Sequence, residues 1–317
     1  MKYTIISERS FTGKTSLLNK HWPFDITLQY GLDAYHIPVS QIIYAKNFGD
    51  ICIIIPSKKN GFPKKWINFI RKRSPNTKLC IMQEGSSFEW QDKSLDYIDA
   101  YIEAFKSGDC ILAHTDRDVR FYKAFHNKVM RVPTCINLET LKPHRIDNWR
   151  EKENKILVKG NLASKFNLPF QLELARVTNY EIFIPTIKAN HPRDFEILKG
   201  VAQLPYFPYN KWNPVLSRFK IITNIINGVA AGQQCLTGAA LGIPVISTNR
   251  LNTANDVFPE LAIDPYDFEK GSDIILKLIN DKTFYEDIRK KGLERVKQYD
   301  YKIVCPKFKK ELETLLK

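Results

Sequence analysis

Short apolar runs alternate with longer amphipathic stretches along this chain, and that alternation limits its fold more than any other feature. The runs are brief, rich in isoleucine and bounded by polar or turn residues, which is typical of strands buried on both faces. Strands that alternate with helices predict a parallel sheet covered by helices, hence the α/β class. In the first half we expect strands at Tyr3–Ser7, Ile51–Pro56, Lys78–Met82 and Cys110–Ala113, and helices at Trp66–Arg73 and Asp96–Lys106.

A second cycle of the same alternation begins near Lys155. Its strands are expected at Ile156–Lys159, Glu181–Pro185, Phe219–Asn224 and Pro244–Ser247, and its helices at Phe166–Arg176 and Gln233–Leu241. Three further helices are expected at Ser272–Asn280, Thr283–Gln298 and Pro306–Leu316.

The chain has 317 residues, a length that usually forms two domains. The polar stretch Lys142–Asn154 is the predicted linker. We therefore expect one Rossmann-like domain over residues 1–145, completed by a C-terminal helix over 303–317, and a second over 146–302. Two such domains facing each other would place the functional site in the cleft between them, at the carboxyl ends of the strands.

The net charge of +14 favours an anionic partner: nucleic acid, anionic lipid headgroups or a phosphorylated substrate. Simple solubility would explain the charge equally well. No apolar stretch approaches the roughly 20 residues of a membrane span, and the N-terminus lacks a signal-like apolar core. We therefore expect a cytoplasmic or peripherally attached protein. The six cysteines form no Cys-x-x-Cys pair and are interpreted as reduced thiols: Cys52, Cys80, Cys110, Cys135, Cys235 and Cys305.

The segment Thr12–Ser16 resembles the end of a phosphate-binding P-loop, but that interpretation fails. The motif needs a glycine five residues before Gly13, and Glu8 stands there, where a carboxylate would repel phosphate. Two alternatives remain open. The segment is an ordinary glycine-containing turn, or it lines the interdomain cleft, where Gly13 would allow close approach of a ligand and Lys14 would meet a phosphate.

Several segments together resemble the family 4 glycosyltransferases and related enzymes of the GT-B fold. The most specific is Thr237–Ile246, which contains Gly-Ile-Pro and is followed by Asp264 and Pro265. The others are Cys110–Thr115 with Lys128–Pro143, and Ile156–Asn161 followed by Lys165. The resemblance extends over roughly residues 110–301. In addition, Gln83–Gly85 with Trp90 and Gln91 resembles phage glycosyltransferases.

This resemblance implies a GT-B architecture in which the second domain binds a nucleotide sugar. The family's Gly-Arg…Lys pattern, which grips the pyrophosphate, matches Gly160 and Lys165, but Asn161 stands in place of the arginine. Lys159 is expected to supply part of the missing charge, because the departing diphosphate gains negative charge. A solvated surface lysine is the alternative for Lys165.

The family also carries two glutamates that hold the donor sugar and ribose. Val229 and Thr237 stand at those positions, so both carboxylates are missing. Gly232 and Gln233 open the same helix, and its free N–H groups are expected to receive a phosphate, while Gln233 and Gln234 would replace the hydroxyl contacts. The alternative is a helix start solvated only by water.

Catalytic candidates follow the strands of the first domain. Glu84 comes directly after the third predicted strand, where a carboxylate could act as general base on an acceptor hydroxyl in an inverting mechanism. Asp92 is the second candidate, and His114, at the end of the fourth strand, ranks below both. Local hydrogen bonding in the loop is the competing interpretation for Glu84, and a structural role is the competing one for His114.

The first domain also contains a strongly basic segment, with no acidic residue between Ser57 and Gln83. Its cations are expected to meet acceptor phosphates, while Trp66 and Phe69 face the core at i, i+3 spacing. The predicted contacts are Lys58, Lys59, Lys64, Lys65, Arg71, Lys72 and Arg73.

Three functions remain open from the sequence. The first is a DNA-modifying glycosyltransferase that acts on a hydroxymethylated pyrimidine, which it would take out of the base stack. The second is a peripheral membrane glycosyltransferase that builds a lipid-linked or surface glycan. The third is a GT-B-shaped binding protein without catalysis. We expect a nucleotide-sugar donor as co-substrate and neither a metal nor another cofactor. The absence of a helix with a large exposed apolar face favours the first function.

Overall fold

A computed structural model describes residues 1–8, 13–14, 24–56, 64–83, 87, 90, 93–160, 166–185, 196–205, 207 and 209–317, with the side chains of 24–26 and 209–210 excepted. The chain divides into two compact units, one formed by Met1–Cys135 with Tyr301–Lys317 and the other by Ile136–Asp300. The boundary lies at Cys135/Ile136, whereas the sequence placed it at 145/146.

The first unit contains a six-stranded parallel sheet of order β2-β1-β3-β4-β5-β6. Its strands are β1 (Tyr3–Ser7), β2 (Tyr35–Pro38), β3 (Ile51–Ile54), β4 (Lys78–Met82), β5 (Cys110–Ala113) and β6 (Val129–Arg131). Its helices are α1 (Phe24–Gly31), the 3₁₀ turn η1 (Val39–Tyr44), α2 (Lys64–Arg73), α3 (Leu95–Lys106), α4 (Asp116–Tyr122) and α13 (Tyr301–Leu316).

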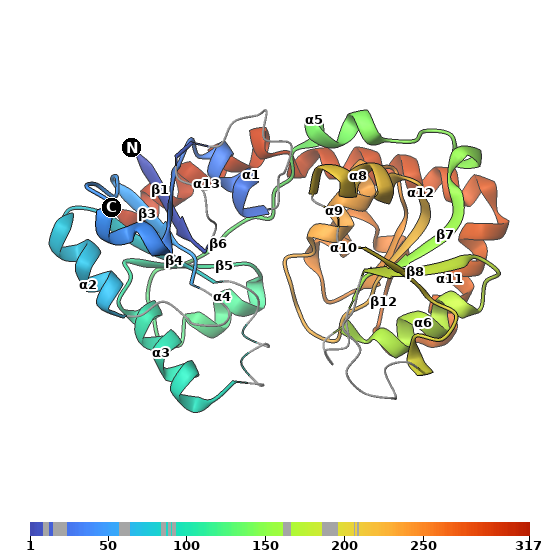
Figure 1. Cartoon of the computed structure of the whole chain (residues 1–317), viewed down its shortest axis with the longest axis horizontal. Helices are drawn as coiled ribbons and strands as arrows, with labels where there is room; N and C mark the ends of the chain where they lie inside the picture. The colour runs from blue at the N-terminus through green and yellow to red at the C-terminus, as the bar shows by residue number, and fades with distance from the viewer. Residues whose placement is uncertain are drawn as a thin grey trace. The chain divides into compact units, whose positions relative to one another are not determined.

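Both faces of this sheet are buried, because successive side chains of a strand point to opposite sides. Ile51 and Ile53 pack with α1 and α13 on one face, whereas Cys52 and Ile54 pack with α2, α3 and α4 on the other. The chain's last helix therefore belongs to the first unit, where it lies beside α1 (Figure 1).

The second unit contains another six-stranded parallel sheet, of order β12-β11-β10-β7-β8-β9. Its strands are β7 (Glu153–Val158), β8 (Glu181–Pro185), β9 (Ala202–Leu204), β10 (Phe219–Asn224), β11 (Val245–Thr248) and β12 (Ala262–Ile263). Its helices and 3₁₀ turns are α5 (Leu138–Leu141), η3 (Lys142–His144), η4 (Trp149–Glu151), α6 (Leu168–Arg176), α8 (Tyr209–Ser217), α9 (Gln233–Ala240), α10 (Asn252–Val257), η6 (Pro259–Leu261), α11 (Phe268–Asn280), α12 (Lys282–Arg295) and η7 (Val296–Tyr299).

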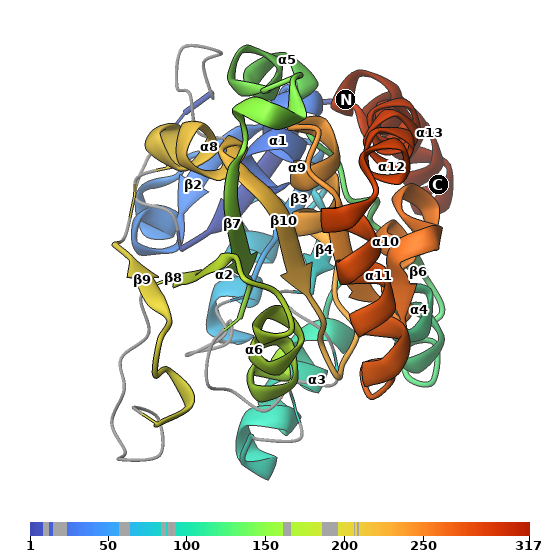
Figure 2. The same cartoon turned by 90° about the vertical axis from the view of Figure 1, so that its right-hand side faces the viewer.

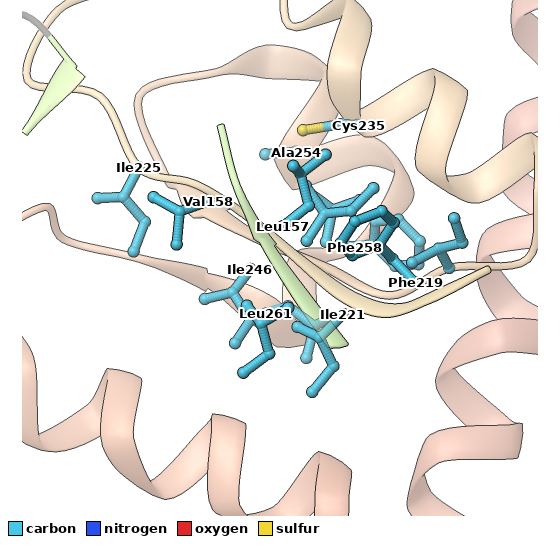
Figure 3. Close-up of a cluster of buried hydrophobic side chains, with 14 of the residues drawn as sticks. Leu157, Val158, Phe219, Ile221, Ile225, Cys235, Ile246, Ala254, Phe258 and Leu261 are labelled. Atoms are coloured by element: carbon cyan, nitrogen blue, oxygen red, sulfur yellow. The ribbon is translucent and has the colours of Figure 1, made fainter. Parts of the chain in front are cut away.

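The core of this unit is built on its two central strands. Leu157 and Val158 of β7 are fully buried, as are Ile221 of β10 and Ile246 of β11 (Figure 3). Strands buried on both faces read as continuous apolar runs, which is why the sequence located them. The structure confirms the α/β class and the two Rossmann-like sheets.

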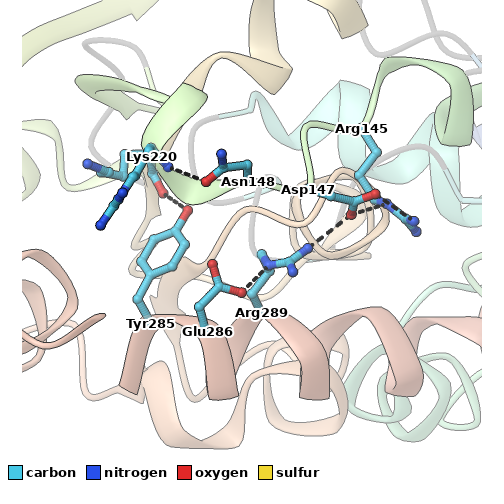
Figure 4. Close-up of polar contacts among 8 residues, drawn as sticks. Arg145, Asp147, Asn148, Lys220, Tyr285, Glu286 and Arg289 are labelled. Atoms are coloured by element: carbon cyan, nitrogen blue, oxygen red, sulfur yellow. Dashed lines mark hydrogen bonds and ion pairs between the residues drawn. The ribbon is translucent and has the colours of Figure 1, made fainter. Parts of the chain in front are cut away.

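The predicted linker does not stand apart from the second unit. It contains η3, η4 and the start of β7. Asp147 accepts hydrogen bonds from Arg145 and from Arg289 of α12, and Arg289 also bonds Glu286 (Figure 4). Asp147 thus connects this stretch to α12.

Two further findings concern the described residues as a whole. All six cysteines are free and buried, as the sequence predicted. Within the described ranges, no helix is both long enough and apolar enough to cross a bilayer.

Candidate functional site

The second sheet has a switch point between β7 and β10. The chain leaves β7 toward β8 and β9 on one side, and returns to place β10, β11 and β12 on the other. The two strands are parallel neighbours, with Leu157 opposite Ile222 and Val158 opposite Thr223 (Figure 2). In open α/β sheets ligands bind beyond the carboxyl ends of the strands at such a point. We call the loops that follow β7, β10 and β11 at this end the carboxyl edge.

Lys159 is the first residue after β7 and carries a cation at this edge. Its backbone N–H donates to Thr223 O at 2.8 Å, so its place beside β10 is fixed. Its ammonium nitrogen lies 5.0 Å from the centre of the Trp212 ring, and it forms no ion pair with any described residue. Burial lowers the pKa of Lys159 below its usual range, because the charged form is desolvated. An anion placed here would offset that cost.

The carboxyl edge lacks acidic side chains of its own. The sequence contains no aspartate or glutamate from Asn154 to Leu172, nor from Ile197 to Asn255. These ranges include every loop residue directly after β7, β10 and β11. The nearest acid after β12, Asp264, faces Arg250 at 3.8 Å. An anionic ligand at this edge would therefore meet no repelling carboxylate from these three loops.

Helix α9 begins at this edge with its N–H groups uncapped. Gly232 precedes the helix in the left-handed region, at φ +71, and provides no side chain to cap it. A Cβ on Gly232 would lie 1.9 Å from Thr253 Oγ1, and that hydroxyl donates to Gly232 O at 3.0 Å. Glycine is thus required both for the backbone conformation and for the contact. The N–H groups without a side-chain cap and the helix dipole make this start suitable for a phosphate.

The first turn of α9 also presents two amide side chains with unused hydrogen-bonding capacity. Gln233 Oε1 and Gln234 Nε2 are buried, and neither has a hydrogen-bond partner among the residues that the structure describes. One is an acceptor and the other a donor, which suits the hydroxyl groups of a sugar or ribose. Thr237 is different, because its hydroxyl donates to Gln233 O at 3.1 Å and its side chain is buried. The Thr237 hydroxyl, which was predicted to contact the sugar donor, therefore donates its hydrogen within its own helix.

Gly160 and Gln171 meet directly at the carboxyl edge. A Cβ on Gly160 would lie 3.2 Å from Phe166 Cβ and 3.5 Å from Gln171 Nε2, so the backbone passes close to both. Gln171, on α6, is fully buried and bonds the loops after β7 and β10. The sequence analysis missed it. The available signal was a polar residue inside the apolar stripe formed by Leu168, Leu172 and Ala175.

Arg250, at the end of β11, was also missed. Its Nη1 donates to Asn227 O, and its guanidinium lies 5.8 Å from the centre of the Tyr266 ring. Arg250 thus joins the loop after β10 to the loop after β12.

The opposite, amino end of the same sheet contains a satisfied polar cluster. Lys220 donates to Asn154 Oδ1 at 2.8 Å and lies 4.0 Å from the Trp149 ring centre. Tyr285 donates to Lys220 O at 3.0 Å (Figure 4). Lys152 is buried and donates to Ser217 O at 2.9 Å, and burial lowers its pKa to about 7. These groups have partners, so we assign them to stability.

In the first unit, the predicted glycine turn lies against β2. Gly13 adopts φ +114 and exchanges backbone hydrogen bonds with His36 at 3.0 Å. Lys14 forms an exposed ion pair with Asp33 at 2.6 Å, so its charge is already neutralised in the structure.

At the carboxyl ends of the first sheet, Ser7 Oγ and His36 Nε2 lie 2.8 Å apart, and both residues are buried. His114 follows β5 directly and is partly buried. Gln83 follows β4, and the nitrogen and oxygen of its buried side-chain amide have no hydrogen-bond partner in the described part of the chain. Glu84 and Asp92, the predicted catalytic carboxylates, lie outside the described residues, as do Asn161, Lys165, Lys58 and Lys59.

The described cations of α2 are largely engaged. Lys64 pairs with Glu103 at 3.2 Å, and Arg71 pairs with Asp109 at 3.0 Å. The other three, Lys65, Lys72 and Arg73, are exposed; Lys65 lies over the Trp66 ring and Arg73 over the Phe69 ring. The helix therefore offers fewer free positive charges than its sequence implies.

A metal site is not evident in the described part of the chain, where no group of three histidine, cysteine, aspartate or glutamate side chains could hold an ion.

Comparison of the coordinates with solved structures identifies the fold. The structure superimposes on sucrose-phosphate synthase from Thermosynechococcus elongatus with a TM-score of 0.72, over 99% of this chain and 98% of that one, at 12% sequence identity. The fold is GT-B-like. An α-glucosyltransferase in complex with UDP and a 13-mer DNA gives a TM-score of 0.66 over 99% of this chain and 90% of that one, at 14% identity.

Sequence comparisons cover much less of the chain than the structural ones. No family model matches the chain. A probable sucrose-phosphate synthase from Oryza sativa subsp. indica is 30% identical over 77 residues, which cover 23% of this chain and 7% of the rice protein. The match thus spans a small part of that relative.

Proposed function

We propose that this chain is a glycosyltransferase that transfers a hexosyl group from a nucleotide-sugar donor to an acceptor that carries phosphate. Its second unit would bind the donor. The GT-B-like fold over nearly the whole chain supports the proposal, and the charge arrangement at the carboxyl edge carries it. There, the Lys159 ammonium has no anionic partner among the described residues and shares the switch point of the sheet with the uncapped start of α9.

This arrangement suits the leaving group of sugar transfer. When the bond between the anomeric carbon and the diphosphate breaks, negative charge grows on the diphosphate oxygens. An ammonium group and preorganised N–H groups stabilise that charge most strongly where water is excluded. Gln233 and Gln234 provide neutral hydrogen bonds where the related family uses carboxylates. The donor's hydroxyl groups would therefore be held without added negative charge.

A panel of nucleotide sugars and nucleoside diphosphates, measured by thermal shift, tests the donor half of the proposal. A ligand that binds only the folded state increases the free energy of unfolding, by about 2.7 kcal/mol at a hundredfold excess over Kd, and so raises the unfolding temperature. We expect at least one uridine or other nucleoside diphosphate to raise it. If no member of the panel shifts the transition, the proposal fails.

DNA containing a hydroxymethylated pyrimidine is our first acceptor candidate. The likeness to an α-glucosyltransferase that was solved with UDP and DNA supports it, together with the exposed cations Lys65, Lys72 and Arg73. A small phosphorylated sugar is the second candidate. The likeness to sucrose-phosphate synthase supports it, and so does the pairing of Lys64 and Arg71, which leaves α2 less charged for a polyanion.

The two acceptors differ in how binding depends on salt. Contacts with several DNA phosphates release counterions, so affinity falls steeply as salt rises, by a slope of about 0.9 per phosphate on logarithmic axes. A single sugar phosphate gives a shallow slope. Transfer of radiolabelled sugar to hydroxymethylated duplex DNA or to a panel of sugar phosphates, measured at 50 and 200 mM salt, separates them. Transfer to neither would remove both candidates.

A further inference from the structure

Gln171 is a fully buried amide on the first turns of α6. Its neighbours along the helix, Leu168, Leu172 and Ala175, are apolar and buried. A buried amide costs stability unless its hydrogen-bonding groups are satisfied. At Gln171 that satisfaction comes entirely from the backbone of two loops of the carboxyl edge.

The amide joins loops that are distant in sequence. Gln171 Oε1 accepts a hydrogen bond from the backbone N–H of Ile225, in the loop after β10, at 3.0 Å. Gln171 Nε2 donates to Phe166 O at 2.6 Å and to Lys159 O at 3.4 Å, both in the segment after β7. One side chain thus bonds both sides of the switch point.

We propose that Gln171 is a positioning residue for donor binding, which fixes Lys159 and Gly160 relative to the loop that leads from β10 to α9. This inference rests on the proposed function, because it assigns Gln171 a role at the same site. Gln171 itself does not reach the ligand, since its side chain is enclosed. It acts through the backbone of Lys159, which carries the ammonium group, and of Gly160, where a ligand can come close to the chain.

Only an amide meets all three demands of this position. Ile225 N–H needs an acceptor, whereas the carbonyls of Lys159 and Phe166 need a donor. A carboxylate would accept from Ile225 but repel both carbonyls, and an apolar side chain would remove all three hydrogen bonds. Asn167, at the start of the same helix, adds a third connection by donating to Pro265 O at 2.7 Å in the loop after β12.

The matched test compares Gln171→Met with Tyr285→Phe. Methionine keeps the volume of the side chain and removes its hydrogen bonds. Tyr285→Phe removes one buried hydrogen bond to the backbone of β10, but at the amino end of the sheet. Both variants are expected to lose thermal stability. Only Gln171→Met should weaken UDP binding in calorimetry, by about tenfold, the lower end of what losing a supporting residue costs a site.

Gln171→Glu provides a rescue that a purely structural role would not show. The introduced carboxyl group is buried beside two carbonyl oxygens, which raises its pKa. In its protonated form it accepts from Ile225 N–H and donates its single hydrogen to one of the two carbonyls, so it restores part of the connection. The ratio of the variant's UDP Kd to that of the parent should therefore be smaller at pH 5.5 than at pH 8.5. A ratio independent of pH would overturn the positioning role.

Hydrogen exchange at the Ile225 amide separates this inference from the proposed function. Faster exchange in Gln171→Met than in Tyr285→Phe would support the loop connection, and equal exchange would overturn it. If the parent protein binds no UDP or any other member of the nucleotide panel, the proposed function fails, and the positioning role fails with it even where the exchange result holds. If the parent binds UDP and Gln171→Met binds it equally well, the positioning role alone is refuted.

Discussion

Replacing Lys159 by methionine should affect ligand binding and stability in opposite directions. The ammonium is desolvated, has no ion pair among the described residues and lies 5.0 Å from the centre of the Trp212 ring. Methionine keeps a similar length without the charge. Removal of a desolvated charge relieves a cost in the free protein, so the unfolding temperature should stay the same or rise.

The loss of binding can be estimated from the interaction removed. A hydrogen bond between a charged donor and a phosphate contributes about 1.5–3 kcal/mol, which corresponds to a factor of about 10–150 in Kd. The pKa of Lys159 is lowered in the free protein, so a bound diphosphate must also restore the charged form. The wild-type affinity for UDP should therefore weaken with rising pH more than that of the variant.

Calorimetric titration with UDP measures the effect, and Lys155→Met is the matched control. Lys155 lies on β7, the strand that Lys159 follows, with its ammonium 5.1 Å from the Phe183 ring centre, but it pairs with Glu153. Its replacement should leave the Kd for UDP unchanged. If Lys159→Met binds UDP as tightly as the parent, or if both variants weaken it equally, Lys159 does not contact the diphosphate.

Two single substitutions and one comparison of multiple substitutions test separate parts of the account. Gly232→Ala should lower stability by more than about 2 kcal/mol, since it combines left-handed strain with the overlap at Thr253 Oγ1, and chemical denaturation would show whether the site tolerates a Cβ. Lys152→Met should stabilise the protein more at pH 6 than at pH 9. The pKa of Lys152 is about 7 in the folded state and 10.5 ordinarily, so between pH 7 and pH 10.5 the unfolded state binds more protons than the folded state. The cost of burying the charged Lys152 therefore falls, and the stability of the wild-type protein rises, as the pH increases across that range. A pH-independent effect would place Lys152 outside that linkage. Replacing Lys65, Lys72 and Arg73 by serine should reduce DNA affinity and flatten its salt dependence more than replacing the paired Lys64 and Arg71; equal effects would argue against contact of α2 with DNA.

The sequence predicted the central strands well, and the peripheral ones poorly. β1, β4, β5, β8 and β10 have the expected bounds, because each forms a clear apolar run, and all of these strands except β8 are largely buried on both faces. β2 was missed because His36 and Pro38 interrupt its apolar pattern, and β12 has only two residues. Short edge strands gain their structure from pairing with a neighbour, and a local pattern does not show that pairing.

The same distinction holds for the candidate site. Gly160 and Gly232 could be located because a motif places glycines where the backbone must pass closely. Gln171 could not, because its partners Lys159 and Ile225 are distant from it in sequence and meet it only in the folded sheet. Lys14 shows the converse, since its predicted phosphate contact overlooked Asp33, nineteen residues away, with which it pairs.

A crystal structure of the protein with UDP would test the central claim most directly. We predict that the diphosphate lies at the carboxyl edge of the second sheet, with hydrogen bonds from the N–H groups of Gln233 and Gln234 and with the Lys159 ammonium moved from the Trp212 ring onto a phosphate oxygen. A diphosphate bound at the amino end of that sheet, or with Lys159 still resting on Trp212, would contradict the account.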